Sequence, residues 1–234
     1  MRIVSWNCRN GLGEMKAKRI LEVFPDADIF VIQECKREDI FAFKDHLMYK
    51  NWYGDDQEYS DLGIAIFSKN YKIEFTDYFN RKFRYVVPYT VIADKKTLTL
   101  FTVWTKPVPL KYDENVIKAI SEYRTFIKGN AIIIGDFNTG YIEKYPERYK
   151  DLCESLKGFK NCTLGKPEEF KKTFYSYKEK ELYLNDFCFV SGSLYDSNNV
   201  KSFCVHEDWR ENDYGQKSWN GLSDHCPIIV DVDF

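Results

Sequence analysis

The sequence lacks the features that place a chain in a membrane or divide it into parts. No segment approaches the run of about 18 apolar residues that a membrane-spanning helix requires. The N-terminus begins with the strand-like run Arg2–Trp6 instead of a charged region followed by an apolar one, so we expect no secretory signal. No linker rich in proline, glycine or serine and no internal repeat interrupts the 234 residues. We therefore expect one domain over residues 1–234, in the cytoplasm and without a membrane partner.

The sequence also lacks an excess of charge of either sign. The chain has 34 Lys and Arg residues against 36 Asp and Glu residues, which gives a formal net charge of −2. This balance does not predict a nucleic-acid-binding protein. It does not exclude one either, because a local basic patch or a bound metal can supply a positive field.

The seven cysteines include no Cys-x-x-Cys pair, and their number is odd. Cys188, Cys204 and Cys226 lie in or beside apolar strand patterns. We therefore expect free, buried thiols in a reducing compartment, with disulfides or a zinc site as the less favoured alternatives.

Apolar residues, by contrast, make up 44% of the chain, which suffices for a large core. Strand-like runs occupy Ile3–Trp6, Ile29–Gln33, Gly63–Ser68, Tyr71–Tyr78, Tyr85–Ala93, Leu98–Trp104, Ala131–Gly135, Leu182–Val190, Val200–Val205 and Ile228–Val232. Helical spacing occurs over Glu14–Phe24, Lys36–Leu47 and Glu114–Ile127, and Asp113 has the residue type of an N-cap for the last. The pattern predicts an α/β fold in which two packed, mostly antiparallel β-sheets are flanked by helices.

Polar residues stand at the ends of several of these apolar runs. Asn7, Glu34 and Asp136 each follow a predicted strand, whereas Asp224 and His225 directly precede the last one. If the last strand runs antiparallel to the others, all of these residues meet at one end of the sheets. Such a group of carboxylate, amide and imidazole side chains could hold a hard divalent cation and hydrolyse a phosphoester.

Taken singly, the acidic motifs have simpler explanations. Glu34 is a suitable Mg²⁺ ligand, but it could equally be a carboxylate at the N-terminus of the helix predicted over Lys36–Leu47. Asp136 and Asn138 flank one phenylalanine at a strand exit, and Gly-Asp-Phe-Asn is a turn signature as often as a functional site. Only their combination favours chemistry.

His225 is one of three histidines, and a lone histidine is more often a satisfied core residue than a functional one. Asp186 changes that balance, because it lies within the apolar strand Leu182–Val190, where a charged carboxylate is costly unless it is paired. An imidazole is the obvious partner. Such a pair would orient His225 and raise its basicity.

These motifs, in this order, carry a resemblance to a known family. The set is Trp6-Asn7, Gln33-Glu34, Gly135-Asp136-Phe137-Asn138, the strand residue Asp186 and Ser223-Asp224-His225. It resembles the endonuclease/exonuclease/phosphatase superfamily, which includes exonuclease III-type apurinic endonucleases and DNase I. The resemblance covers nearly the whole chain and implies a four-layered α/β sandwich.

By resemblance, Glu34 would bind the metal ion, with Asn7 and Asp224 close enough to share or orient it. The implied cofactor is Mg²⁺, for which Mn²⁺ could substitute. Whether one or two metal ions act is left open.

The same resemblance assigns the catalytic roles. Asp136 would position or deprotonate the attacking water, and Asn138 would hold a phosphate oxygen. His225, paired with Asp186, would donate to the phosphate in the transition state.

Trp104 departs from the family pattern. After the predicted strand at Leu98–Val103 the family usually places a His or Tyr that aids the leaving group or contacts phosphate. An indole N–H can donate a hydrogen bond but transfers no proton usefully, so Tyr141 or the metal ion would have to assist the leaving oxygen. Trp104 is then a candidate for substrate binding.

The segments Thr173–Tyr177 and Ser223–Ile228 are most similar to the apurinic-endonuclease branch. Basic and aromatic side chains that could contact nucleic acid are Arg81, Lys82, Arg84, Lys106, Lys144, Trp209, Arg210 and Trp219. Of these we select Arg84, Lys106 and Trp219, beside Trp104; the alternative is solvated surface charge and aromatics that anchor loops. The link from Tyr177 to Asp186 is short, so abasic-site specificity is not implied.

The leading hypothesis is a Mg²⁺-dependent phosphodiesterase that cleaves nucleic acid, with DNA preferred, as an endonuclease or exonuclease. A small phosphoester is the second substrate class, motivated by the near-neutral charge and short loops. A third hypothesis, motivated by Trp104, is a nucleic-acid-binding module whose site has decayed. We expect a monomer, and the sequence identifies no protein partner.

Overall fold

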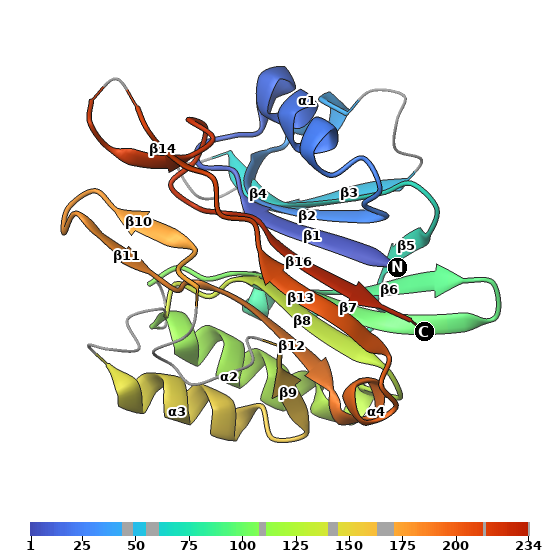
Figure 1. Ribbon diagram of the computed structural model, residues 1–234. Coiled ribbons are helices and arrows are strands. Elements are labelled where there is room, and N and C mark those ends of the chain that lie inside the picture. The colour runs from blue at the N-terminus through green and yellow to red at the C-terminus, as the bar shows by residue number, and fades with distance from the viewer. Residues whose placement is uncertain are drawn as a thin grey trace.

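Two six-stranded β-sheets pack face to face in the computed structural model, which describes residues 1–43, 49–54, 61–107, 111–139, 145–162, 171–212 and 214–233 (Figure 1). The first sheet has the order β13-β16-β1-β2-β4-β3 and the second β5-β6-β7-β8-β12-β9. In each sheet one neighbouring pair is parallel, β1–β2 in the first and β7–β8 in the second, and the other pairs are antiparallel. The predicted sandwich of two mostly antiparallel sheets is confirmed.

The strands of the first sheet are β1 (Arg2–Asn7), β2 (Ile29–Lys36), β3 (Tyr49–Gly54), β4 (Leu62–Ser68), β13 (Val200–Val205) and β16 (Ile228–Val232). Those of the second are β5 (Lys72–Phe75), β6 (Val86–Ala93), β7 (Lys96–Trp104), β8 (Ala131–Asp136), β9 (Phe159–Asn161) and β12 (Asp186–Ser191). Two small hairpins, β10 (Phe174–Ser176) with β11 (Glu181–Tyr183) and β14 (Trp209–Glu211) with β15 (Lys217–Trp219), extend beyond the sheets at one end (Figure 1).

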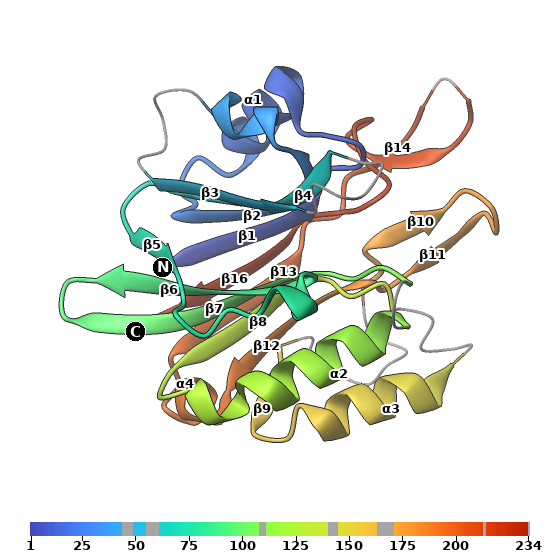
Figure 2. The ribbon, with the colours of Figure 1, turned by 180° about the vertical axis from the view of Figure 1, so that it is seen from behind.

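Helices cover the outer faces of both sheets and complete the four layers (Figures 1 and 2). Helix α1 (Gly13–Val23) buries Ala17 and Ile20 against the first sheet, and Pro25 follows its end. On the second sheet lie α2 (Tyr112–Tyr123) and α3 (Pro146–Ser155), and the short α4 (Gly192–Asp196) follows β12. None of the helices in the described ranges is long and apolar enough to cross a membrane.

Two apolar layers hold this arrangement together. Strand residues of both sheets, such as Val31 of the first and Leu100 and Ile134 of the second, pack into one buried core. The second layer lies under α2, whose buried positions Val116, Ile120 and Tyr123 follow the helical period. Because the strands are buried on both faces, their ends are the places where polar side chains can reach a shared surface.

The predicted helix over 36–47 is wrong where the structure describes it: only the 3₁₀ turn η1 (Glu38–Phe41) forms, and 44–48 lie outside the described residues. Asp39 explains the difference. Its buried carboxylate accepts hydrogen bonds from the backbone N–H groups of Lys36, Leu12 and Gly13, at 3.0, 2.7 and 3.1 Å. These bonds favour a tight turn tied to the loop before α1.

Three smaller expectations also differ from the structure. Lys111 precedes α2 as its N-cap, while Asp113 lies inside the first turn and pairs with Arg148 at 2.7 Å. The strand predicted over 182–190 is interrupted: β11 ends at Tyr183, and β12 begins at Asp186. All seven cysteines are free as expected, but Cys204 is exposed because β13 is an edge strand.

Candidate active site

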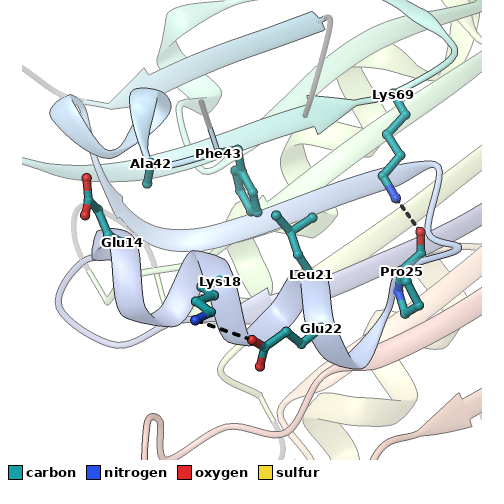
Figure 3. Close-up of a pocket in the computed structure, with 8 residues that line it drawn as sticks. All are labelled: Glu14, Lys18, Leu21, Glu22, Pro25, Ala42, Phe43 and Lys69. Carbon is teal, nitrogen blue, oxygen red and sulfur yellow. Dashed lines mark hydrogen bonds and ion pairs between the residues drawn. The ribbon is translucent and has the colours of Figure 1, made fainter. Parts of the chain in front are cut away.

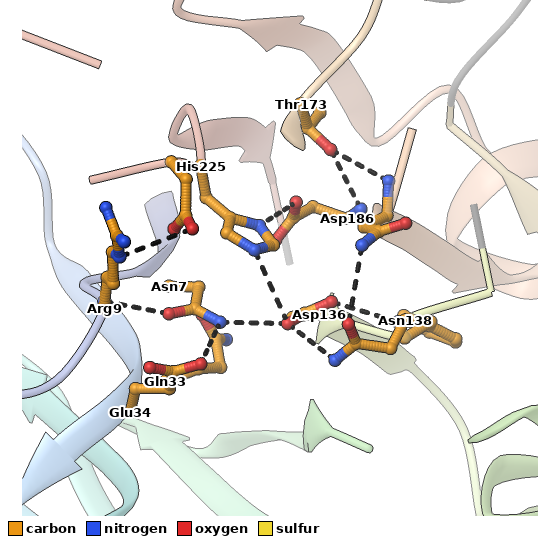
Figure 4. Close-up of polar contacts among 12 residues, drawn as sticks. Asn7, Arg9, Gln33, Glu34, Asp136, Asn138, Thr173, Asp186 and His225 are labelled. Atoms are coloured by element: carbon orange, nitrogen blue, oxygen red, sulfur yellow. Dashed lines mark hydrogen bonds and ion pairs between the residues drawn. The ribbon is translucent and has the colours of Figure 1, made fainter. Parts of the chain in front are cut away.

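The strand directions bring the predicted site residues together at one end of both sheets (Figure 4). Because β1 and β2 are parallel, Asn7 and Glu34 emerge at the same end, and β16 begins there because it runs antiparallel to β1. In the second sheet Asp136 ends β8 and pairs with Asp186, the first residue of β12. His225, just before β16, then reaches across to Asp186.

Glu34 occupies a β-bulge in β2. The register with β4 shifts between Gln33 and Cys35, and Glu34 adopts a φ of +56°, a strained conformation for a residue with a side chain. Its carboxylate accepts hydrogen bonds from Asn7 Nδ2 at 3.2 Å and from the Asn10 backbone N–H at 2.9 Å. It does not cap the following turn. The bulge instead directs Glu34 toward the group of polar side chains at these strand ends, which we call the cluster: Asn7, Glu34, Asp136, Asp186, Asp224 and His225.

Asp136 is buried and held by two asparagines. Asn7 Nδ2 and Asn138 Nδ2 each donate to its Oδ2 at 2.9 Å, and the Asn138 backbone N–H donates to Oδ1 at 3.0 Å. Burial raises the pKa of Asp136 to about 7, with the charge of Asp186 adding to this effect and that of His225 opposing it. A carboxylate with such a pKa can exchange a proton near neutral pH.

His225 lies between two carboxylates. Its Nδ1 is 2.9 Å from Asp186 Oδ2, and its Nε2 is 3.9 Å from Asp136 Oδ2. Burial alone would lower the pKa of His225, but the charges of Asp186 and Asp136 outweigh that effect and raise it to about 10. The two carboxylates therefore favour the protonated imidazole, whose Nε2 faces Asp136.

Surrounding polar groups fix these side chains. Ser223 Oγ donates to the carbonyl of Asn7 at 2.7 Å and accepts from the His225 N–H at 3.1 Å. Thr173 Oγ1 accepts from the Asp186 N–H at 3.1 Å. The other carboxylate oxygen of Asp186, Oδ1, is buried without a hydrogen-bond partner among the residues that the structure describes.

Asp224 is mostly buried, and burial raises the pKa of its carboxyl, with Glu34 adding to this and with His225 and Arg9 opposing it. Its cationic neighbour is Arg9, whose Nε lies 3.4 Å from Asp224 Oδ2. Sequence reasoning missed Arg9, and it named Thr173 only within the segment Thr173–Tyr177, without a role. The position of Arg9 two residues after the Trp6-Asn7 motif was the available signal.

The substrate-binding candidates separate into two groups. Trp104, Arg84 and Lys106 line one small recess beside the cluster, where Lys106 Nζ lies 4.4 Å above the Trp104 ring. Trp104 also pairs with Asp136 in the β7–β8 ladder. The recess thus groups two cationic side chains around Trp104, which is itself buried and covered by Lys106.

Trp219 does not belong to this group. Its side chain is fully buried, its ring packs edge-on against Trp6 at 5.0 Å, and its Nε1 donates to His206 Nδ1 at 3.4 Å. The choice of Trp219 as a substrate contact is therefore wrong: it is an aromatic that anchors the last hairpin. Tyr141 and Lys144 lie outside the described residues.

A larger recess of about 560 Å³ lies elsewhere, between α1 and Phe43 (Figure 3). Its floor is apolar, and charged groups at its edge are satisfied locally: Lys18 pairs with Glu22 at 3.8 Å, and Lys69 donates to the Pro25 carbonyl at 2.6 Å. Because α1 covers the outer face of the first sheet, this recess is separate from the cluster.

Two groups of side chains could hold a metal ion. Ligand atoms of Asp136, Asp186 and His225 lie within 4.8 Å of one another. All three are buried, however, and are already bonded to one another, whereas Mg²⁺ usually retains several water ligands. Glu34 is partly exposed and presents carboxylate oxygens, so it fits a hard cation better.

The rest of the predicted ligand set fits less directly. Asn7 directs its amide nitrogen to Glu34, while its Oδ1 accepts from the Arg9 N–H at 2.9 Å. Asn7 therefore orients Glu34 and Asp136 in this arrangement. Asp224 remains an oxygen donor beside Glu34, with Arg9 as its neighbour.

Comparison with known proteins identifies the family of this chain. The model of the Endonuclease/Exonuclease/phosphatase family matches residues 4–225, so the chain belongs to this family of phosphoester-hydrolysing enzymes. The resemblance inferred from the ordered motifs is confirmed. A search of curated proteins finds no match.

Solved structures share the fold over the full chain. The endonuclease domain of TRAS1, a telomere-specific non-LTR retrotransposon, has a TM-score of 0.71 at 15% identity and covers 100% of this chain and 98% of its own. The 3′ phosphatase NExo from Neisseria, bound to a product DNA hairpin, has a TM-score of 0.69 at 18% identity, with both chains covered at 100%. An AP endonuclease from Archaeoglobus fulgidus has a TM-score of 0.70 at 17% identity, also with both chains covered at 100%.

Proposed function

We propose that this protein is a divalent-metal-dependent phosphodiesterase that cleaves nucleic acid, with DNA as the preferred substrate. The observation that carries the proposal is the convergence of Asp136 and the His225–Asp186 pair at the strand ends. A buried imidazolium held within 3.9 Å of a carboxylate of raised pKa gives one cationic donor and one proton acceptor in the same small volume.

His225 would act on the phosphate. Asp186 accepts from Nδ1 and fixes the ring, so Nε2–H can donate to a non-bridging phosphate oxygen as negative charge accumulates there. Because Asp186 is buried, this orientation is kept without competition from water.

Asp136 would act on the nucleophile. The amides of Asn7 and Asn138 hold its Oδ2, and a water that enters the site with the substrate would lose a proton to the carboxylate during attack. Asn138, at the edge of the cluster, would contact a phosphate oxygen.

Glu34, with Asp224, would hold the metal ion, and Mg²⁺ is the first candidate because the donors are all oxygens. Such an ion supplies charge stabilisation to the phosphate and the leaving oxygen. This contribution matters here because Trp104 offers no acidic proton for the leaving group.

Nucleic acid is the proposed substrate because Arg84 and Lys106 supply positive charge around Trp104, the strand neighbour of Asp136. The similar fold of NExo, which was solved with DNA, supports the same choice. We extend the proposal to one catalytic domain over 1–234; a monomeric state and a cytoplasmic location stay predictions from the sequence.

The test is cleavage of an end-labelled DNA duplex, a single strand, and a duplex with one abasic analogue, each with Mg²⁺, with Mn²⁺ and with EDTA. Asp136→Asn should reduce a metal-dependent activity by about 10²–10⁴-fold without lowering the midpoint of thermal unfolding. Cleavage that survives in Asp136→Asn would come from a contaminant or another site. If only small phosphoesters are hydrolysed, the metal chemistry stands and the nucleic-acid substrate is wrong.

A further inference from the structure

Arg9 is held on a fixed loop at the mouth of the cluster. It adopts a φ of +53°, and its backbone N–H is bonded to Asn7 Oδ1. From the inner side, Lys16 Nζ donates to the carbonyls of Cys8, Arg9 and Gly11. The loop that carries Arg9 is therefore organised before any ligand arrives.

The guanidinium of Arg9 is also positioned by its neighbours. It donates to the hydroxyl of Tyr177, and its Cζ lies 4.2 Å from the centre of the Tyr177 ring. Its Nε is 3.4 Å from Asp224, and 38% of the side chain is exposed. Stacking and the Tyr177 bond thus place a partly exposed cation at the surface of the site.

The contact with Asp224 is longer than those in two other arginine–aspartate pairs that the structure describes. Arg2 bonds Asp231 through two nitrogens at 2.7 and 2.9 Å, and Arg148 bonds Asp113 at 2.7 and 3.3 Å. Arg9 instead offers Asp224 only Nε, at 3.4 Å, a distance longer than in any of these four bonds. Among the described residues, none accepts a hydrogen bond from Arg9 Nη2. Much of the planar guanidinium is therefore open to a ligand.

The position of Arg9 relative to the reacting groups suggests what it binds. Asp136 lies on β8, between Trp104 on β7 and Asp186 on β12. The Trp104 recess is on one flank, whereas Tyr177 follows β10 on the Asp186 flank. Figure 4 shows Arg9 and Asn138 at opposite edges of the cluster. A ligand that touches both flanks must extend past the phosphate at His225.

We propose that Arg9 binds a second, uncleaved phosphate of a nucleic-acid strand, on the opposite flank from Lys106, and so selects polynucleotides over small phosphoesters. This inference rests on the proposed function. The planar fork suits the oxygens of a phosphate, and the preorganised loop limits the entropy lost on binding. Tyr177 is the positioning residue for Arg9.

The experiment compares an oligonucleotide with bis(4-nitrophenyl) phosphate, a diester that has no second phosphate. Arg9→Gln should reduce kcat/KM on the oligonucleotide about 10–100-fold, mainly through KM, and leave the small diester within about twofold. Its plot of log(kcat/KM) against log[salt] should become shallower by about one unit. Arg9→Lys, which keeps the charge but not the fork, should fall between the wild type and Arg9→Gln, and Tyr177→Phe should show a smaller loss of the same kind.

Arg19→Gln is the matched control, because it removes one exposed arginine charge on α1, and it should change neither substrate. Equal losses on both substrates in Arg9→Gln would mean that Arg9 only supports Asp224, which overturns this inference and leaves the proposed function intact. A wild type that hydrolyses neither substrate with Mg²⁺ or Mn²⁺ would overturn the proposed function itself. Melting curves of every variant check folding.

Discussion

Among the glycines that the structure describes, Gly135 has the least room for a side chain, and Gly135→Ala tests that directly. A Cβ added there would lie 2.1 Å from the Val103 carbonyl oxygen, and this contact must lengthen to at least 3.0 Å. Gly135 pairs with Val103 in the parallel β7–β8 ladder and has a φ of +144°. Alanine would be strained at this φ, and its Cβ would push two buried strands apart. Because both effects destabilise the fold, we expect a loss of about 2–4 kcal/mol in the free energy of unfolding.

The functional cost should be large as well. Asp136 follows Gly135, and Trp104 follows Val103, so separation of these strands displaces both sides of the cluster. A shift of about 1 Å can lower catalysis by about 10²-fold. Guanidinium denaturation gives the stability, and cleavage of labelled DNA by the folded fraction gives the activity.

The control is Gly129→Ala, at the turn before β8. Its φ is +83°, but an added Cβ meets no atom of the described structure within 4 Å. Gly129→Ala should therefore lower the free energy of unfolding only by the cost of the unfavourable φ, about 1 kcal/mol, and should keep full activity. If Gly135→Ala costs no more than Gly129→Ala, the close approach of the two strands is not what requires glycine.

Two further substitutions remove one carboxylate each, Asp186 in the site and Asp231 in an ion pair on β16. Asp186→Asn should lower kcat at least 10²-fold and, since Asp186 raises the pKa of His225, shift the alkaline loss of activity to lower pH; an unchanged pH–rate profile would show that the pair does not control the reaction. Asp231→Asn should cost about 0.5–1 kcal/mol, a value reduced by solvent screening. Arg2 and Ser202 bond the Asp231 carboxylate and lower its pKa, so this stability is present above about pH 4 and is lost as the pH falls further. Urea unfolding from pH 3 to 7 should show the difference from wild type vanish at the acid end, and a constant difference would contradict it.

Residues next to regular strands were the ones that the sequence could place. Asn7 and Asp136 directly end apolar runs, and His225 precedes one, so the strand directions alone bring them together. The pairing of Asp186 with His225 followed from the cost of an isolated carboxylate in an apolar strand. Their catalytic roles stay predictions.

The misses arose from contacts between distant segments. Asp39 converts the expected helix into a turn by binding N–H groups near residue 12, which no local period reveals. The sequence around Trp219 is typical of an exposed loop, yet the side chain is buried because it packs against Trp6. Arg9 carries no periodic signal and gains its place from Tyr177 and Asp224.

The charge of the site itself argues for a divalent ion. The acidic side chains of the cluster are Glu34, Asp136, Asp186 and Asp224, and the cationic ones in contact with them are Arg9 and His225. Left alone, this cluster would repel a phosphodiester, although it is built from groups suited to cleave one. A divalent cation at Glu34 and Asp224 would offset the excess negative charge where the phosphate enters, while Arg9 and Lys106 would attract the strand on either side. A chain of near-neutral net charge can thus act on a polyanion, because the balance that matters is local.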